Sequence, residues 1–186
     1  CNGLSDGSID LTVSGGTTSY TYVWINTAQV TQDITGLNAN TYSVLVTDVN
    51  GCTTSNTITL TEPAALTTTI AISSNYNGQN VSCNGSNDGS IDLTVAGGTT
   101  GYTYGWSNSI NTEDISGITA GTYSVLVTDV NGCTTTNTIT LTEPAALTTT
   151  IAVSSNYNGQ NISCNGLSDG SIDLSVTGGT TNYTYN

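Results

Sequence analysis

Five cysteines are the residues of this chain whose side chains offer the most reactive chemistry. They are Cys1, Cys52, Cys83, Cys133 and Cys164. The chain has no histidine and no Cys-x-x-Cys spacing, so the usual zinc-binding pattern is missing. We therefore expect these thiols to form disulfides in an oxidising compartment.

Aspartates in turn sequences and at strand starts offer a second chemistry, because carboxylate oxygens are ligands that calcium prefers. The candidate calcium ligands are Asp6, Asp10, Asp48, Asp88, Asp92 and Asp129. Their spacing does not match a complete EF-hand loop. Aspartate also shapes turns through hydrogen bonds from its side chain to the backbone. Calcium is the one cofactor that the sequence suggests, and turn formation is the alternative use of these residues.

Catalysis has few candidate groups in this chain. Lysine, arginine and histidine are absent, so the usual general bases and activated nucleophiles are missing. A carboxylate pair of the glycosidase type would remain. Asp6 and Asp10 form such a pair, but they lie at a turn and a strand start where no deep pocket is expected. We do not expect an enzyme.

Asparagine supplies a modification chemistry. Four positions match the Asn-x-Ser/Thr pattern for N-glycosylation: Asn80, Asn84, Asn161 and Asn182. Such matches arise by chance in a chain rich in asparagine and threonine. Clusters of exposed threonine could carry O-linked sugars instead. Glycosylation is therefore an expectation that the mass of proteolytic peptides would test.

Composition excludes two classes of partner. The formal net charge is −13 with no cationic side chain, which removes the electrostatic attraction that nucleic-acid binding requires. The same charge argues against anionic lipid surfaces. No apolar run approaches the roughly 18–20 residues of a membrane span, so we expect no direct membrane insertion.

An internal repeat organises the chain. The motif Cys-Asn-Gly recurs at residues 1, 83 and 164, and Asp-Val-Asn-Gly-Cys ends at both Cys52 and Cys133. The repeat length is therefore about 81 residues. We define repeat 1 as residues 1–63, which lacks its first strand, repeat 2 as the complete 64–144, and repeat 3 as the partial 145–186. The pattern indicates a slice of a longer tandem array.

Alternating apolar residues in repeat 2 predict short β-strands separated by Gly and Asn turns. The expected strands cover 66–72, 80–83, 91–95, 102–106, 114–118, 123–127 and 138–142. Six or seven strands in about 80 residues predict an all-β, immunoglobulin-like β-sandwich. Trp106 is expected between the sheets, and Tyr123 at a tyrosine corner, where its hydroxyl binds the backbone upstream.

The repeats leave three disulfide pairings open. Pairing within a repeat joins Cys83 to Cys133 and closes a loop of about 50 residues, which contributes on the order of 4 kcal/mol. A sandwich would place these two cysteines at opposite ends, roughly 25 Å apart, beyond disulfide reach. Pairing between neighbouring repeats joins Cys1 to Cys133 instead. A third possibility joins Cys52 to Cys83 and Cys133 to Cys164.

The ordered motifs of the repeat resemble SprB-type repeats. The motifs are Cys-Asn-Gly-x-x-Asp-Gly-Ser-Ile-Asp-Leu, Tyr-Thr-Tyr-x-Trp, Gly-Thr-Tyr-Ser-Val-Leu-Val-Thr-Asp-Val-Asn-Gly-Cys and Thr-Glu-Pro-Ala-Ala-Leu. Such repeats occur in tandem in large cell-surface adhesins of Bacteroidetes, including the gliding-motility adhesin. The resemblance implies export by type IX secretion and an extracellular location at the bacterial surface. It implies no catalytic residue and no ligand.

Two functions follow as expectations. The first is a structural stalk of a surface filament or adhesin, in which neighbouring repeats are the partners of each repeat. Disulfides would prevent unravelling, and the absence of lysine and arginine removes every trypsin-type cleavage site. The alternative is a carbohydrate-binding module, in which aromatic and Asn-rich loops bind surface glycans with avidity from repetition.

Overall fold

β-Strands are the only regular secondary structure of the chain. The structure, a computed structural model, describes every residue from Cys1 to Asn186. In chain order the strands are β1 (Gly7–Ile9), β2 (Thr21–Ile25), β3 (Ile34–Leu37), β4 (Asn40–Thr47), β5 (Thr53–Leu60), β6 (Thr67–Ile72), β7 (Gly89–Ala96), β8 (Thr103–Trp106), β9 (Ile115–Ile118), β10 (Gly121–Thr128), β11 (Thr134–Leu141), β12 (Thr148–Val153) and β13 (Ile172–Thr177). No segment is a helix that could cross a membrane.

The chain forms two compact units, which differ from the sequence repeats. Unit 1 consists of residues 1–67, 95–102 and 128–135. It therefore contains repeat 1 together with the segments at one end of repeat 2. Unit 2 consists of residues 68–94, 103–127 and 136–186.

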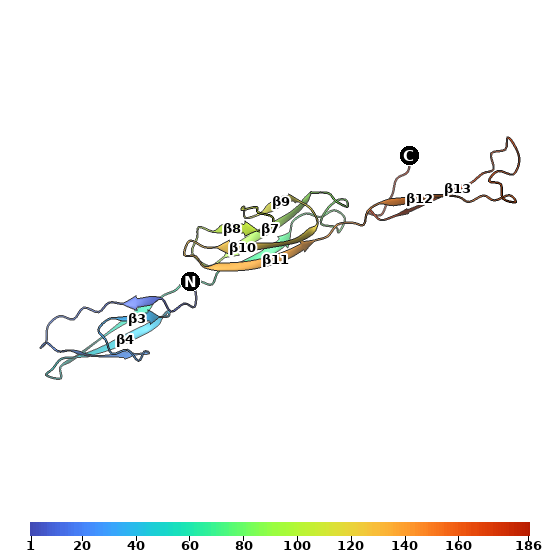
Figure 1. The fold of residues 1–186 in the computed structure, drawn as a ribbon. Coiled ribbons are helices and arrows are strands. Elements are labelled where there is room, and N and C mark those ends of the chain that lie inside the picture. Colours follow the sequence, from blue (N-terminus) through green and yellow to red (C-terminus); the bar gives the residue numbers. More distant parts are fainter. The chain divides into compact units, whose positions relative to one another are not determined.

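Repeat 2 has the strand order of an immunoglobulin sandwich (Figure 1). One sheet has the order β6-β7-β9, and the other has the order β11-β10-β8. With the six strands lettered A, B, C, E, F and G in chain order, the sheets are A-B-E and G-F-C, as in immunoglobulin domains. The predicted all-β, immunoglobulin-like fold is confirmed.

Alternation of side chains builds the core of repeat 2. In β10, Tyr123, Val125 and Val127 are buried, whereas Leu126 between them is exposed, as expected when successive residues point to opposite faces. The other buried hydrophobic residues of this repeat are Val81, Ile91, Leu93, Trp106, Ile115, Ile118 and Leu141. Trp106 is 4 % exposed, as the sequence predicts.

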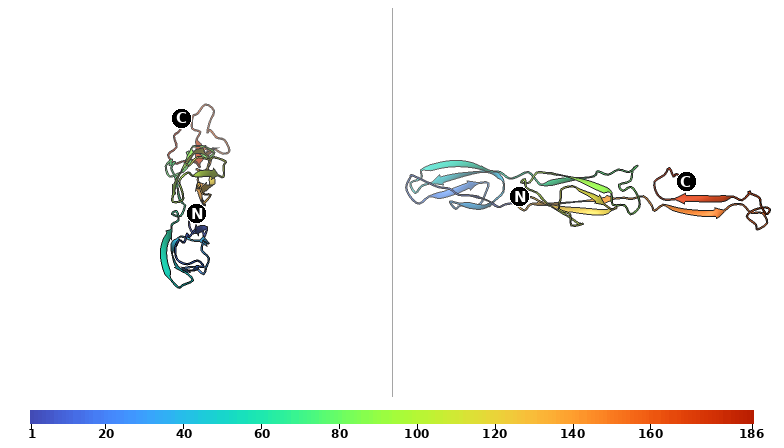
Figure 2. Two further views of the ribbon diagram at one scale, coloured as in Figure 1. Left: turned by 90° about the vertical axis from the view of Figure 1, so that its left-hand side faces the viewer. Right: turned by 90° about the horizontal axis from the view of Figure 1, so that it is seen from above.

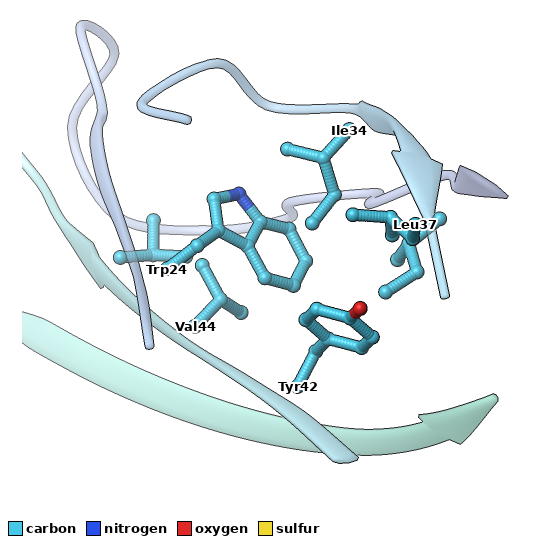
Figure 3. Packing of buried hydrophobic residues seen from close by; sticks show 7 residues of the cluster. Trp24, Ile34, Leu37, Tyr42 and Val44 are labelled. Atoms are coloured by element: carbon cyan, nitrogen blue, oxygen red, sulfur yellow. The ribbon is translucent and has the colours of Figure 1, made fainter. Parts of the chain in front are cut away.

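Repeat 1 builds the same kind of core from fewer strands (Figure 3). β1 pairs with β3, while β4 lies between β2 and β5. Trp24, Ile34 and Tyr42 come from β2, β3 and β4 and pack in one cluster, with Leu37 and Val44 beside them. Burial of an aromatic side chain of this size removes about 150–250 Å² from water.

A tyrosine corner fixes the start of the central strand in both repeats. The Tyr123 hydroxyl donates to the Thr119 carbonyl at 2.9 Å, and the Tyr42 hydroxyl donates to the Asn38 carbonyl at 3.0 Å. Each bond satisfies a polar group at the edge of an apolar core. The predicted tyrosine corner is present.

One expected strand is wrong. Residues 80–83 form a bend rather than a strand. The Asn80 side-chain oxygen accepts the Thr142 backbone N–H and hydroxyl, both at 2.8 Å. These side-chain bonds add to one backbone bond, from the Asn80 N–H to the Thr142 carbonyl at 3.3 Å. The bend places Val81 in the core with no exposed area.

Repeat 3 contains one hairpin. β12 and β13 pair antiparallel, from Thr148 opposite Thr177 to Val153 opposite Ile172. Figure 2 shows them as a two-stranded ribbon. Ile151, Val153, Ile172 and Leu174 are exposed, and Val176 is half-buried.

Candidate functional site at the junction of repeats 1 and 2

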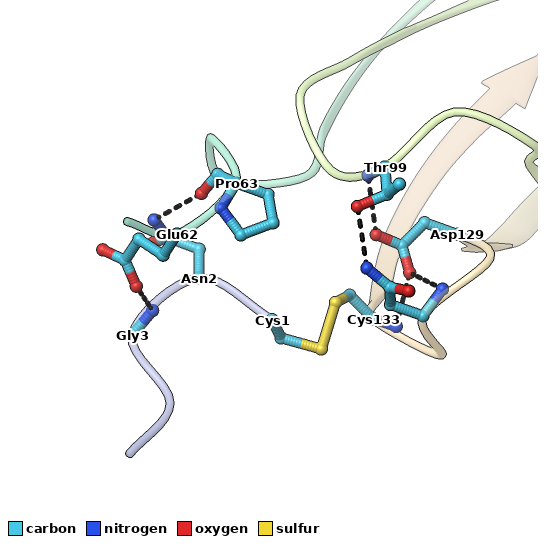
Figure 4. Close-up of a disulfide and its surroundings, with 9 residues drawn as sticks. Cys1, Asn2, Gly3, Glu62, Pro63, Thr99, Asp129 and Cys133 are labelled. Carbon is cyan, nitrogen blue, oxygen red and sulfur yellow. Dashed lines mark hydrogen bonds between the residues drawn. A yellow bond between two sulfur atoms is a disulfide. The ribbon is translucent and has the colours of Figure 1, made fainter. Parts of the chain in front are cut away.

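A disulfide links repeat 1 to repeat 2. Cys1 and Cys133, which both belong to unit 1, are bonded with their Cα atoms 5.5 Å apart (Figure 4). This is the pairing between neighbouring repeats. The pairing of Cys83 with Cys133 is not formed, and Cys52, Cys83 and Cys164 are exposed free thiols.

Strand length explains why Cys83 does not reach Cys133. Gly85 follows Cys83 and Asn84 in the same turn, and its backbone N–H donates to the Glu143 carboxylate at 2.7 Å. This bond holds the turn at the end of β11. Cys133 lies just before the start of the same strand. The eight residues of β11 span roughly 25 Å, whereas a disulfide needs Cα atoms within about 7 Å.

An aspartate holds the turn that carries Cys133. One carboxylate oxygen of Asp129 accepts the backbone N–H of Asn131 at 2.9 Å and of Cys133 at 2.8 Å. The other oxygen accepts the Thr99 backbone N–H at 2.9 Å. Asp129 is 4 % exposed, so these three donors replace the water that its charge would otherwise bind.

The same donors change the acidity of Asp129. The backbone N–H of Thr99, followed by those of Cys133 and Asn131, holds the pKa of Asp129 below its ordinary value of 3.8, against the opposing effect of desolvation. Hydrogen bonds to a carboxylate favour its charged form. The junction therefore keeps a buried negative charge that is stabilised mainly by backbone N–H donors.

A glutamate and an asparagine hold the turn that carries Cys1. The Glu62 carboxylate accepts the Gly3 backbone N–H at 2.6 Å, and the Asn2 amide donates to the Pro63 carbonyl at 3.0 Å. Both bonds connect the start of repeat 1 to its own Glu-Pro end, as Figure 4 shows. They place Cys1 beside the linker that leads into repeat 2.

Two glycines of repeat 2 receive this linker. The Gly98 backbone N–H donates to the Ala64 carbonyl at 2.8 Å. A Cβ atom on Gly97 would lie 1.9 Å from the Ala65 carbonyl oxygen, so only glycine allows this approach. Gly97 also has a φ of +74°, which other residues rarely adopt.

The turn held by Asp129 has a counterpart in repeat 1. Asp48 accepts the backbone N–H groups of Thr17, Asn50 and Cys52, as Asp129 does with their counterparts. Thr17 and Cys52 contribute most to a pKa of Asp48 below 3.8. The aspartate-held turn is thus formed in both repeat 1 and repeat 2.

The remaining predicted calcium ligands are distributed over the surface. Asp6, Asp10 and Asp92 are exposed. Asp88 accepts the Ser82 backbone N–H at 3.1 Å. Asp48 and Asp129 serve the two turns described above, and no three His, Cys, Asp or Glu side chains come together in a group that could hold a metal ion.

Two of the four predicted glycosylation positions have a structural use. Asn80 binds Thr142 through its side-chain oxygen, and the Asn84 amide donates to the Glu143 carboxylate at 2.8 Å. Asn161 and Asn182 are exposed.

The roles of Glu62 and Glu143 were not predicted from the sequence. The motifs Cys-Asn-Gly and Thr-Glu-Pro-Ala-Ala recur together, and this recurrence could have indicated a contact between them.

Fold and junction together define a class of protein: tandem immunoglobulin-like β-sandwich repeats, here with a disulfide between neighbours. The SprB repeat family matches residues 1–29, 75–111 and 156–186, about half of the chain. The chain therefore belongs to the SprB repeat family, as its motifs predict.

No curated protein matches the chain. Among solved structures, the amphioxus IgVJ-C2 molecule is similar at 14% identity with a TM-score of 0.35, over 75% of this chain and 97% of that chain. SprB repeats occur in cell-surface proteins, and both this repeat and the immunoglobulin-like fold are non-enzymatic kinds of domain.

Proposed function

We propose that the chain is a load-bearing stalk region of an extracellular bacterial surface filament or adhesin. The observation that supports this most is the Cys1–Cys133 disulfide, which spans a sequence separation of 132 residues. Tension applied at Cys1 passes through the two sulfur atoms to Cys133. The sandwich strands between them are then relieved of that load.

The junction contacts support the same function. The Glu-Pro-Ala-Ala linker is held by contacts with both repeats. Its Glu62 and Pro63 bind the turn of Asn2 and Gly3 in repeat 1, and its Ala64 binds Gly98 in repeat 2. Neighbouring repeats are the partners in this proposal. A chain without lysine or arginine also resists trypsin-type proteases outside the cell. The proposal includes export by type IX secretion and a role in gliding motility.

Mechanical pulling of the full chain between its two ends tests the stalk. The oxidised chain is expected to extend only over residues 133–186, about 190 Å at roughly 3.5 Å per residue. Reduction is expected to add about 460 Å, because the residues between the two bonded cysteines become extensible. Cys52→Ser is the matched control and should change neither length, because Cys52 is a free thiol. Full extension of the oxidised chain would exclude a load-bearing disulfide.

Carbohydrate binding is a second proposed function, favoured by one observation. Unit 2 has a cavity of about 730 Å³ whose lining includes Asn75, Tyr76, Asn84 and Tyr183. This volume suits a small ligand, and amide and aromatic side chains suit the polar and apolar faces of a sugar. Glycan-array binding by the full chain, lost in Tyr76→Ala, would support this function. An array without any signal would exclude it.

A further inference from the structure

Asparagine followed by glycine recurs in the turns of this chain. The glycines of these pairs have φ angles between +76° and +89°, a region that residues with a Cβ atom rarely adopt, so the turns require glycine. The seven pairs are Asn2-Gly3, Asn50-Gly51, Asn77-Gly78, Asn84-Gly85, Asn131-Gly132, Asn158-Gly159 and Asn165-Gly166. All seven asparagines are exposed to solvent.

An Asn-Gly pair has a characteristic reaction, which is deamidation. The glycine nitrogen attacks the side-chain carbonyl carbon of asparagine, its proton leaves with the amide nitrogen as ammonia, and a succinimide ring forms. Water then opens the ring to aspartate or isoaspartate. Glycine favours the attack because it has no side chain to hinder it. Since these asparagines are exposed, protection from the reaction must come from bonds that hold the reacting groups.

The glycine N–H donates a hydrogen bond in six of the seven pairs. The acceptors are the Glu62 and Glu143 carboxylates for Gly3 and Gly85, the Asp48 and Asp129 carbonyls for Gly51 and Gly132, and the Asn75 and Asn156 side-chain oxygens for Gly78 and Gly159. A nitrogen that donates in this way is harder to deprotonate, because the anion would face the lone pairs of its acceptor. These bonds therefore oppose the attack.

Glu143 holds both reacting groups of one pair. One of its carboxylate oxygens accepts the Gly85 N–H at 2.7 Å, and the other accepts the Asn84 amide at 2.8 Å. Cyclisation breaks both bonds, because the Gly85 nitrogen loses its proton and the Asn84 amide nitrogen leaves as ammonia. Hydrogen bonds to a charged acceptor are the stronger kind. Glu143 therefore stabilises the unreacted pair at both of its reacting atoms.

The aspartate-held turn holds its Asn-Gly pair in a similar way. The Asn131 amide donates to the Thr99 hydroxyl at 2.8 Å, and the Gly132 N–H donates to the Asp129 carbonyl at 3.0 Å. The counterpart pair Asn50-Gly51 makes the same two bonds in repeat 1. Both reacting groups are thus hydrogen-bonded in two different kinds of turn.

We propose that the folded turns keep these six asparagines as latent deamidation sites, which react only when their turn opens. Opening removes the hydrogen bonds and frees the glycine nitrogen for attack. At Asn84 the product also opposes closure, because the reaction replaces an N–H donor to Glu143 with a second carboxylate. The chain has no lysine or arginine to balance the added charge. Deamidation therefore leaves a permanent record that the turn has opened.

The first test compares the folded chain with the chain unfolded in guanidinium, both oxidised and incubated at neutral pH. Peptide mapping by mass spectrometry measures the rate of deamidation at each asparagine. We expect the rates at Asn84 and Asn131 to be at least about tenfold lower in the folded chain, because charged and neutral hydrogen bonds must be broken before attack. Equal rates in the folded and unfolded chains would overturn the proposal without the use of any variant.

The second test removes the carboxylate that holds one pair. Glu143→Ala is expected to raise the rate at Asn84 by about tenfold, through the loss of two charge-assisted bonds, and to leave the rate at Asn131 unchanged. Glu113→Ala is the matched control, because it removes the same charge from an exposed glutamate that holds no Asn-Gly pair. It should change neither rate.

Three results of the second test would overturn the role of Glu143. They are equal rates at Asn84 in the two variants, a slower reaction at Asn84 in Glu143→Ala, which would mean that the carboxylate promotes the attack, and an equal rise at Asn84 and Asn131. The proposal is independent of the stalk function, because pulling measures the internal disulfide whereas peptide mapping measures the chemistry of the turns.

Discussion

The hairpins β6–β7 and β12–β13 have nearly the same sequence and opposite surroundings. Ile91 and Leu93 of β7 are 1 % and 2 % exposed, whereas their counterparts Ile172 and Leu174 of β13 are 68 % and 45 % exposed. The strand pairing is present in both. In repeat 2 the second sheet, formed by β8, β10 and β11, covers the apolar face of this hairpin.

The two aspartate-held turns have the same geometry and differ in burial. The Asp48 and Asp129 turns make the same hydrogen bonds. Asp129 is buried beside the Cys1–Cys133 bond, whereas Asp48 beside the free Cys52 is half-buried. The turn is a local structure, and contact with a neighbouring repeat only covers it.

Removing the disulfide should produce the largest difference in unfolding free energy between the Asp129 turn and the Asp48 turn. Cys133→Ser opens a loop defined by a sequence separation of 132 residues, which lowers the free energy of unfolding by about 5 kcal/mol through loop-closure entropy. Cys52→Ser, in the equivalent turn with a free thiol, should change it by less than about 0.5 kcal/mol. Urea unfolding followed by the fluorescence of Trp24 and Trp106 measures both. Equal losses would mean that the turn, rather than the bond, carries the stability.

Truncation of one isoleucine should separate the two hairpins by a smaller amount. Ile91→Ala leaves a cavity in a closed core and should cost about 2–5 kcal/mol. Ile172→Ala removes the same atoms from an exposed face and should change the free energy of unfolding by less than about 0.5 kcal/mol. The midpoint of urea unfolding at constant slope is the measurement. A large loss in Ile172→Ala would show that repeat 3 has a covered face in solution.

The sequence was sufficient for the fold because each strand of the sandwich carries its own alternation. Tyr123, Val125 and Val127 identify one face of β10 without any knowledge of its partners. The sequence left three disulfide pairings open. It also gave an argument against pairing Cys83 with Cys133, because the length of a strand separates these two residues. The rest of the junction could not be derived, since the contacts of Gly97 with the linker depend on how one repeat follows another. Residues 80–83 were misassigned for a related reason: Asn80 binds Thr142, which is distant in sequence.

Acid should produce the smallest difference in stability between the Asp129 turn and the Asp48 turn. The pKa of Asp129 is held below 3.8 in the folded chain, mainly by the Thr99 backbone N–H, and the pKa of Asp48 is lowered in the same way by Thr17. An unfolded aspartate binds its proton near pH 3.8, before the folded one does. Each turn therefore contributes stability above pH 3.8 and loses it as the pH falls through the lower, folded pKa.

Asp129→Asn should flatten the dependence of unfolding free energy on pH below 3.8, and Asp48→Asn should flatten it to a similar extent, because the two carboxylates accept equivalent N–H groups. Urea unfolding at a series of pH values, with the disulfide kept oxidised, measures the slope. If only Asp129→Asn altered the slope, burial beside the disulfide would control the acidity of these turns. Equal changes in the two variants would show that the hydrogen bonds of the turn are sufficient, with or without a neighbouring repeat.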